Sequence, residues 1–244
     1  MNADFEIIKK LSELAKQGPI KPIGHGPNSV GKTLQSSLGL THTTASRNSF
    51  LGYTISATSS SLGGGARTNL FACVADWNRS PFKSTFEMVN RIGRPDESRG
   101  YAKSLFCTVT SLSNNGFGLS LKVQGEELEE YWVASGKSIL VAKWDPDKLK
   151  AKLEGIGKHV LVQAQVVKTN SERRYHFRYA EILSEPDPNM FFNLLESGSI
   201  TVDHLIALKA GAASAVEKGP LFKIRSDAKK ILHPSCCRVD LLDY

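Results

Sequence analysis

Two long β-type runs constrain this chain most strongly. His159–Lys168 and Tyr175–Ile182 are rich in β-branched and aromatic residues, and a short polar segment separates them. This pattern predicts two long antiparallel strands. Strands of this length must pack against another layer, so an all-helical bundle is excluded.

Amphipathic helix patterns elsewhere make the fold class mixed. Phe5, Ile8, Leu11 and Ala15 recur at three- and four-residue spacing and predict a helix over Ala3–Gln17. Further helices are predicted at Val30–Leu38, Lys83–Ile92, Asp145–Leu153 and Pro188–Glu196. We therefore expect an α/β (α+β) fold.

The remaining strands are expected to be shorter. Phe50–Ala57 and Asn69–Ala75 predict a hairpin or two adjacent strands. Leu105–Thr110 and Phe117–Val123 predict a hairpin across a turn that contains asparagines and a glycine, and the polar Gly93–Lys103 predicts a loop. The last segments predict a strand at Ser138–Lys143, then strands or a strand-and-helix mixture at Ile200–Leu208, Leu221–Ile224 and Val239–Leu242.

Composition favours a basic protein that acts inside the cell. The 244 residues can bury one sizeable core, and 31 Lys and Arg against 24 Asp and Glu give a net charge of +7. This charge favours a polyanion such as nucleic acid, although a basic protein without an anionic ligand has the same balance. The 4 cysteines lack CxxC spacing, and no apolar run is long enough to span a membrane. We expect a reduced, cytoplasmic protein with no membrane partner.

Several short motifs occur in an order that resembles a known family. They are Gly31-Lys32-Thr33-Leu34, the strand beginning at Phe50, Leu70-Phe71 before Trp77, Gly198 to His204, and Gly219 to Ile224. Together they resemble the MvaI/BcnI family of type II restriction endonucleases and, more distantly, the mismatch-repair nuclease MutH. The resemblance covers Gly18 to Leu242.

The resemblance implies a restriction-endonuclease-like mixed sheet flanked by helices. Residues 1–244 would form a single domain with a catalytic-type lobe, mainly in the N-terminal half, and a DNA-recognition lobe, mainly in the C-terminal half. Double-stranded DNA would lie in the cleft between the lobes, and the protein would act as a monomer. Family members hydrolyse a phosphodiester with Mg²⁺, which carboxylates bind and a lysine assists. The family motif is Asp, four residues, Glu, one residue, Lys, with a further carboxylate from the preceding helix.

This chain has neutral residues at all four of those positions. The Asp position corresponds to Ser49, the Glu to Thr54, the Lys to Ser56 and the helix carboxylate to Gln35. Hydroxyl and amide oxygens cannot offset the dehydration of Mg²⁺ as two carboxylates do. We expect no intact catalytic set, no metal site and no cofactor at this position.

Other interpretations stay open. An active nuclease could have relocated its ligands, with Asp76 and Glu87 as the nearest acids, and Mg²⁺ would then be required. An interaction module could have kept the fold without binding DNA. Gly26–Thr33 fits the spacing of a phosphate-binding P-loop, but no strand is predicted before it, so nucleotide hydrolysis is disfavoured.

The expected DNA contacts are basic residues in two regions that match DNA-facing segments of the family. Each could also be a solvated surface charge. Arginine or lysine can bind phosphates or read guanine. The first group is Arg67, Arg79, Lys83, Arg91 and Arg94, and the second is Lys209, Lys218, Lys223 and Arg225.

The histidines and cysteines do not predict a catalytic centre. No histidine has a partner at zinc-ligand spacing. Asp203 and His204 should point to opposite faces of a strand, which favours a structural or DNA-contacting role for the histidine. The sequence thus predicts a pseudo-nuclease that binds double-stranded DNA in a restriction or defence system, with an effector protein as a further partner.

Overall fold

The structure is a computed structural model that describes residues 3–26, 28–40, 49–59, 67–169, 172–217 and 219–244. The chain divides into two compact units that interleave in sequence. Unit 1 comprises Met1–Gly63, Ile156–Pro186 and His233–Tyr244, and unit 2 comprises Gly64–Gly155 and Asp187–Leu232.

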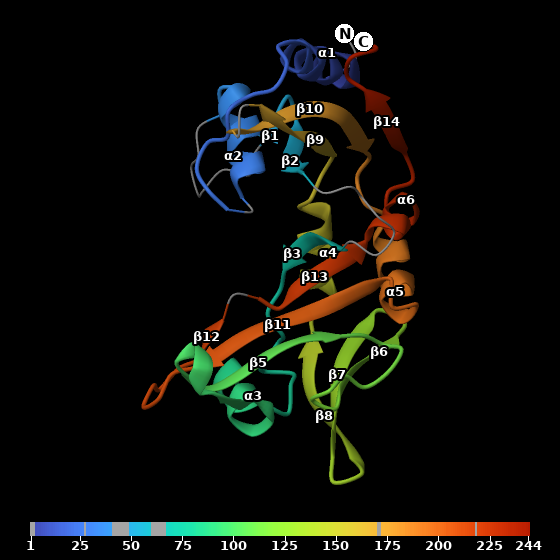
Figure 1. The fold of residues 1–244 in the computed structure, drawn as a ribbon. Coiled ribbons are helices and arrows are strands. Elements are labelled where there is room, and N and C mark those ends of the chain that lie inside the picture. The colour runs from blue at the N-terminus through green and yellow to red at the C-terminus, as the bar shows by residue number, and fades with distance from the viewer. Residues whose placement is uncertain (1–2, 27, 41–48, 60–66, 170–171, 218) are drawn as a thin grey trace. The chain divides into compact units, whose positions relative to one another are not determined.

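Unit 1 is a mixed sheet packed against two helices (Figure 1). Its sheet order is β1-β2-β9-β10-β14, in which β2 and β9 are parallel and the other pairs antiparallel. The elements are α1 (Ala3–Lys16), α2 (Ser29–Ser37), β1 (Ser49–Phe50), β2 (Tyr53–Thr58), β9 (His159–Thr169), β10 (Glu172–Leu183) and β14 (Cys236–Asp240).

The core of unit 1 fixes which strand faces are available for a site. Leu11 of α1 and Leu34 of α2 are fully buried against Tyr53 and Ile55 of β2 and Val160 of β9. Because side chains alternate along a strand, the residues between them point to the opposite sheet face. Thr54 and Ser56 therefore lie on the face that the helices do not cover.

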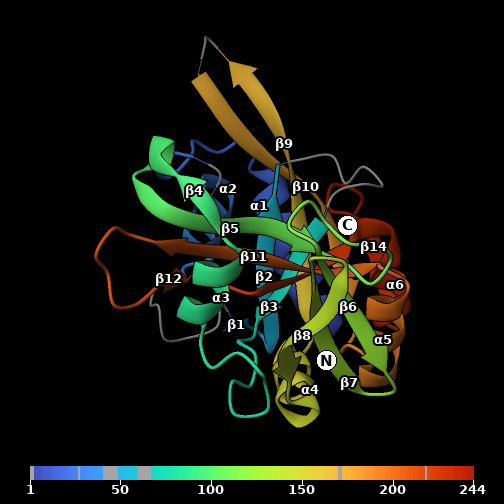
Figure 2. The same cartoon turned by 90° about the horizontal axis from the view of Figure 1, so that it is seen from below.

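Unit 2 contains two antiparallel sheets with helices packed against them. The first sheet has the order β3-β13-β11-β5-β4, with β12 also paired to β11, and the second has the order β6-β7-β8. Figure 2 shows α3 lying against β5 and β11. The strands are β3 (Arg67–Ala72), β4 (Arg94–Asp96), β5 (Tyr101–Val109), β6 (Leu119–Gln124), β7 (Glu127–Ala134), β8 (Lys137–Trp144), β11 (Ile200–Leu208), β12 (Val216–Glu217) and β13 (Leu221–Arg225). The helices are α3 (Thr85–Ile92), α4 (Pro146–Glu154), α5 (Pro188–Glu196) and α6 (Lys229–Leu232), with 3-10 turns at Glu97–Arg99 and Ser226–Ala228.

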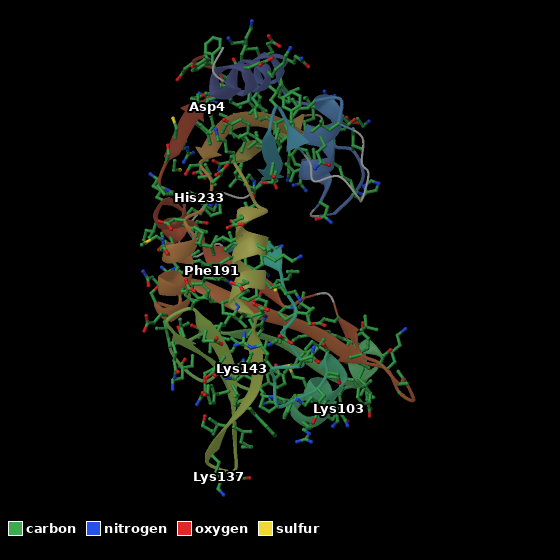
Figure 3. All side chains as sticks on the ribbon, turned by 180° about the vertical axis from the view of Figure 1, so that it is seen from behind. Asp4, Lys103, Lys137, Lys143, Phe191 and His233 are labelled. Atoms are coloured by element: carbon green, nitrogen blue, oxygen red, sulfur yellow. The ribbon has the colours of Figure 1, made fainter. Side chains whose placement is uncertain are left out.

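An aromatic cluster forms the inner side of the first sheet of unit 2. The Phe222 ring stacks on Phe71 at 4.9 Å and meets Trp144 edge-on at 6.0 Å. Phe191 of α5, labelled in Figure 3, packs against both phenylalanines. The alternate residues of β3, β11 and β13 consequently form a second face.

Several sequence expectations are confirmed. The mixed α/β class is observed, and the five predicted helices and the β9–β10 antiparallel pair are present. Asp145 caps α4, as predicted from the sequence. Its carboxylate accepts hydrogen bonds from the backbone N–H groups of Asp147 and Lys148.

Three local predictions are wrong. β2 and β3 belong to different sheets, and so do β5 and β6, because each finds its partners far away in the sequence. The side chain of Asn115 still closes the β5–β6 turn by bonding the Thr108 carbonyl at 2.9 Å. The predicted loop Gly93–Lys103 contains β4 and the start of β5. Strand β7 was not predicted, because its glutamates obscure the strand pattern.

No described helix is long and apolar enough to cross a membrane. The four cysteines are free thiols. Burial raises the pKa of the Cys107 thiol to about 12, which makes it a poor nucleophile.

Candidate functional site

The four positions that the sequence analysis assigned to the family's catalytic residues all lie in unit 1. Gln35 is in α2, Ser49 in β1, and Thr54 and Ser56 in β2. The register of β1 and β2 sets Ser49 directly opposite Thr54. The backbone therefore places the positions predicted to correspond to the family's Asp and Glu side by side, and the position predicted for the Lys lies two residues along β2.

The hydroxyls of this strand are engaged with unit 1 itself. Thr54 Oγ1 donates to the Ile156 carbonyl at 3.2 Å. Ser56 Oγ lies 2.7 Å from His159 Nε2 on the neighbouring strand β9. Sequence reasoning treated His159 as one of several scattered histidines, and only the parallel pairing of β2 with β9 brings it beside Ser56.

The donor set at these positions does not fit a catalytic divalent cation. A hard cation such as Mg²⁺ is held by carboxylates and neutral oxygens, and it retains its water unless charged ligands compensate. Gln35, Thr54 and Ser56 supply no charge. In the part of the chain that the structure describes, no group of three His, Cys, Asp or Glu residues could hold a metal ion.

The two acids considered as relocated ligands serve local structure in unit 2. The Asp76 carboxylate accepts from the Asn78 N–H at 3.0 Å and closes a turn. Glu87 accepts from the Lys83 N–H at 2.8 Å and pairs with Arg91 at 2.9 Å.

The P-loop interpretation also fails on geometry. Helix α1, not a strand, precedes Gly26–Thr33, in which Pro27 lies outside the described residues. Thr33 is fully buried, and its hydroxyl donates to the Ser29 carbonyl at 2.7 Å and accepts from the Ile23 N–H at 2.9 Å. A hydroxyl held in this way cannot ligate the Mg²⁺ of a nucleotide.

A charged cluster on the second face of unit 2 is the strongest candidate for ligand binding. Asp203 of β11 accepts from Arg67 Nη1 at 2.6 Å and pairs with Lys223 Nζ at 2.7 Å. Thr108 Oγ1 donates to the same carboxylate at 2.8 Å, and Arg67 also reaches Thr201 Oγ1 at 2.8 Å. We call Arg67, Thr108, Thr201, Asp203 and Lys223 the Asp203 cluster.

The electrostatics of the Asp203 cluster keep its carboxylate charged. Burial acts to raise the pKa of Asp203, but the hydrogen bonds from Lys223, Arg67 and Thr108 outweigh it and lower the pKa. Two cations surround one anion, so the cluster carries a net positive charge. Strand register adds Arg225, which lies opposite Arg67 on the same face.

The other predicted DNA-contacting residues are not gathered into this cluster. Arg79 makes two hydrogen bonds to Glu127 of β7, at 2.8 and 3.0 Å. Lys83 Nζ donates to the Ser80 carbonyl at 2.7 Å, and Arg94 bonds the Gly116 carbonyl while its guanidinium lies 4.5 Å from the Phe117 ring centre. Lys209 is exposed after β11, and Lys218 lies outside the described residues.

Asp203 and His204 point to opposite faces, as predicted. His204 is 2 % exposed, and its Nε2 lies 3.0 Å from the carboxylate of the fully buried Glu130. Burial acts to lower the pKa of His204, but the attraction and hydrogen bond of Glu130 outweigh it and raise the pKa. This histidine is therefore a structural residue, and the DNA-contacting alternative is wrong.

The chain combines a unit with a mixed α/β sheet and a second unit with a basic sheet face. A comparison with known families identifies the class. The sequence profile of the MvaI/BcnI restriction endonuclease family matches residues 8–233, and the chain belongs to this family.

Two solved structures share the fold. One is described as the restriction endonuclease MvaI in complex with its cognate DNA substrate, with a TM-score of 0.73, 15% identity and 99% coverage of both chains. The other is MvaI in the absence of DNA, with a TM-score of 0.61, 15% identity and 98% coverage of both chains. A comparison with curated protein sequences found no match.

Proposed function

We propose that this protein binds double-stranded DNA through the Asp203 cluster and has lost phosphodiester hydrolysis at the family's catalytic position. The observation that carries the proposal is the Asp203 cluster itself, a positively charged hydrogen-bonding group on a sheet face of unit 2. The family membership, and the similarity in fold to a structure described as a complex with cognate DNA, support DNA as the ligand.

The chemistry of the cluster suits a G·C base pair. A guanidinium or ammonium group can donate to guanine O6 and N7 in the major groove, and a carboxylate can accept from cytosine N4. Lys223 and Arg67 have partly exposed side chains, at 22% and 31%, so they can exchange Asp203 for a base edge. The proposal therefore includes recognition of a short site rich in G and C.

The remaining basic residues are assigned to phosphate contacts, which fix the register of the duplex without reading sequence. This set consists of Arg79, Lys83, Arg91, Arg94, Lys209, Lys218 and Arg225. Their contribution to specificity should be smaller than that of the cluster, because phosphate contacts carry no sequence information.

The donor set in unit 1 supports the proposed loss of hydrolysis. Efficient cleavage needs a bound cation that lowers the pKa of the attacking water and neutralises the transition state. The four neutral residues do not supply the charge that holds such a cation, and Ser56 replaces the lysine that would stabilise the developing negative charge.

The binding test uses the purified full-length chain and a fluorescent duplex of mixed sequence. Anisotropy is measured from 50 to 300 mM salt, with single-stranded DNA as competitor. Affinity should fall steeply with salt, because phosphate contacts release counterions. A flat salt response or no binding at all would overturn the proposal.

A matched pair of variants locates the interface. Lys223→Ala should weaken binding about tenfold, since a good base contact is worth roughly 1–3 kcal/mol. Lys137→Ala removes the same charge from the tip of the β7–β8 hairpin, labelled in Figure 3, and should leave affinity unchanged. Equal loss in both variants would exclude this face.

The cleavage test separates the rival functions. The protein is incubated with plasmid and Mg²⁺ or Mn²⁺. Site-specific cutting would support an active endonuclease with relocated ligands, whereas absence of both cutting and binding would support a non-DNA interaction module. Binding without cutting is the result we expect, and it fits a DNA-sensing component whose effector is another chain.

A further inference from the structure

An apolar pocket lies on unit 2 beside the Asp203 cluster. It has a volume of about 180 Å³ and is lined by Tyr101, Phe106, Leu205, Ala207 and Val216. The Tyr101 and Phe106 rings meet edge-on with centroids 6.1 Å apart. Val216 is 46% exposed, so the pocket opens to solvent at β12.

Strand register places this pocket on the same sheet face as the Asp203 cluster. Leu205 and Ala207 follow Asp203 at two-residue steps along β11, and Leu205 pairs with Phe106 as Asp203 pairs with Thr108. Val216 pairs with Ala207 and extends the same face. Two residues of a strand span about 6.8 Å, and two base-pair steps of DNA span about the same distance. The cluster and the pocket can therefore face base pairs about two steps apart.

The size and the lining of the pocket indicate what it can take. An apolar cavity of about 150 Å³ can hold a benzene ring, so this pocket can take the edge of a single ring. Its lining has one polar side-chain group, the Tyr101 hydroxyl. A base flipped out of the duplex needs several hydrogen-bonding partners and is poorly matched.

The rim of the pocket favours a polyanion over an apolar protein partner. The Arg99 guanidinium lies 5.3 Å from the centre of the Phe106 ring. Its side chain is 62% exposed, and its ion pair with Asp96, at 3.6 Å, is a weak surface pair that a phosphate can replace. An apolar pocket with a cation at its rim and a base-reading cluster along the same strand matches the major groove.

We propose that this pocket takes the C5-methyl group of a pyrimidine, thymine or 5-methylcytosine, in DNA bound at the Asp203 cluster. The C5-methyl is the apolar group that the major groove presents, and aromatic or aliphatic side chains read it by contact. This inference rests on the proposed DNA binding and adds a specificity determinant to it. Phe106 and Leu205 contact the methyl group, while Val216 closes the pocket.

The test begins by selecting duplexes from a randomised pool with the full-length protein. The selected duplex is then made with deoxyuridine in place of each thymidine in turn, and with 5-methylcytosine or cytosine, each opposite guanine, at the same position. Deoxyuridine removes the methyl and leaves the pairing edge intact. At one position, loss of the methyl should weaken binding about fourfold or more, the value of one buried methyl. The 5-methylcytosine arm shows which pyrimidine is accepted.

Variants of the pocket tie the effect to this site. Phe106→Leu and Val216→Thr should bind methylated and unmethylated duplexes equally, with thermal unfolding confirming the fold. Ile139→Ala, at an exposed apolar residue of β8, is the control and should keep the discrimination.

Three results would overturn the inference. Insensitivity of every position to the methyl, or discrimination that survives in both pocket variants, would show that the pocket does not read it. A dimer in solution that Val216→Thr dissociates would assign the pocket to self-association. Absence of any selected or salt-sensitive binding is a different failure, because it removes the proposed DNA binding itself.

Discussion

The Ser56 face of unit 1 and the Asp203 face of unit 2 are both strand faces turned away from an apolar core, and they differ in charge. On β2, Thr54 and Ser56 bond neutral groups or a histidine, and none of the described family positions is ionised. On β11, Asp203 is surrounded by Arg67 and Lys223. The Ser56 face has only neutral side chains at the positions that we assigned to the family's charged residues, and the Asp203 face carries a charged cluster.

This difference separates what binding needs from what hydrolysis needs. In a cluster that reads DNA, the basic side chains can pair with a carboxylate of the protein in the absence of DNA. They can then exchange that carboxylate for DNA groups when the duplex binds. Hydrolysis needs carboxylates that are not paired with basic side chains, so that they can bind a metal ion. Under our proposal, the neutral residues of β2 keep the strand intact and remove only the capacity for hydrolysis.

The largest expected effect comes from restoring the charges on the Ser56 face. The combination Gln35→Glu, Ser49→Asp, Thr54→Glu and Ser56→Lys recreates the family's carboxylates and lysine on α2, β1 and β2. We expect Mn²⁺ to raise the unfolding temperature of this variant and not that of the natural chain, because binding to the folded state stabilises it. Nicking of plasmid DNA with Mg²⁺ should appear from a zero background.

The restored variant has an internal control. The same four substitutions with Thr54→Gln in place of Thr54→Glu keep similar volume but lack one carboxylate, and should lose both the metal response and the nicking. Equal behaviour of the two variants would show that the register assigned to these positions is wrong.

The second effect is loss of affinity at the Asp203 face. The double variant Arg67→Ala with Lys223→Ala removes both cations of the cluster. Two base contacts worth roughly 1–3 kcal/mol each predict a loss on the order of a hundredfold or more for the selected duplex. Anisotropy with selected and scrambled duplexes measures it, and the scrambled duplex should lose much less. Uniform loss on both would indicate phosphate contacts alone.

The same two faces show what sequence could predict. The motif spacing placed Ser49, Thr54 and Ser56 on one strand, but the structure divides this run into β1 and β2, which pair antiparallel across a turn at Leu51 and Gly52. The contact of Ser56 with His159 could not be predicted, because it depends on a parallel pairing across about a hundred residues, and loop closure leaves no local signal of such pairing. For the same reason the strands β5 and β6, adjacent in sequence, were wrongly predicted to pair.

The basic residues chosen as DNA contacts remain predictions, and their partners within the protein could not be predicted. Lys223 and Arg67 were chosen as DNA contacts from the family pattern, yet no sequence signal linked them to Asp203, since three strands must align first. Strand β7 was not predicted, because its glutamates suggested an exposed polar segment. In the structure Glu130 is instead buried beside His204, and glutamate is rarely buried unless it has a partner.

A smaller effect is expected on stability as a function of pH. Because the pKa of Asp203 is lowered in the folded protein, its contribution is fully present above the unfolded value near 3.8 and is lost as pH falls through the folded value. Asp203→Asn should cost about 1–2 kcal/mol at pH 6, and this difference should shrink below about pH 4. Urea unfolding from pH 3 to 6 measures it. Asp147→Asn, at the exposed first turn of α4, is the control, and a cost independent of pH would contradict the assigned charge.

The smallest effect should come from the Ser56 face of the natural chain. Ser56→Ala removes the hydrogen bond to His159 and should lower the free energy of unfolding by about 1 kcal/mol, while Ser138→Ala at an exposed site of β8 should cost less. DNA affinity should remain within about twofold, because a hydroxyl bonded inside unit 1 contributes nothing to the charge that DNA meets. Urea midpoints and anisotropy on the same preparations test both statements. A tenfold loss of affinity would place DNA against β2 and would mean that both faces bind it. The neutral side chains of the Ser56 face argue against this outcome.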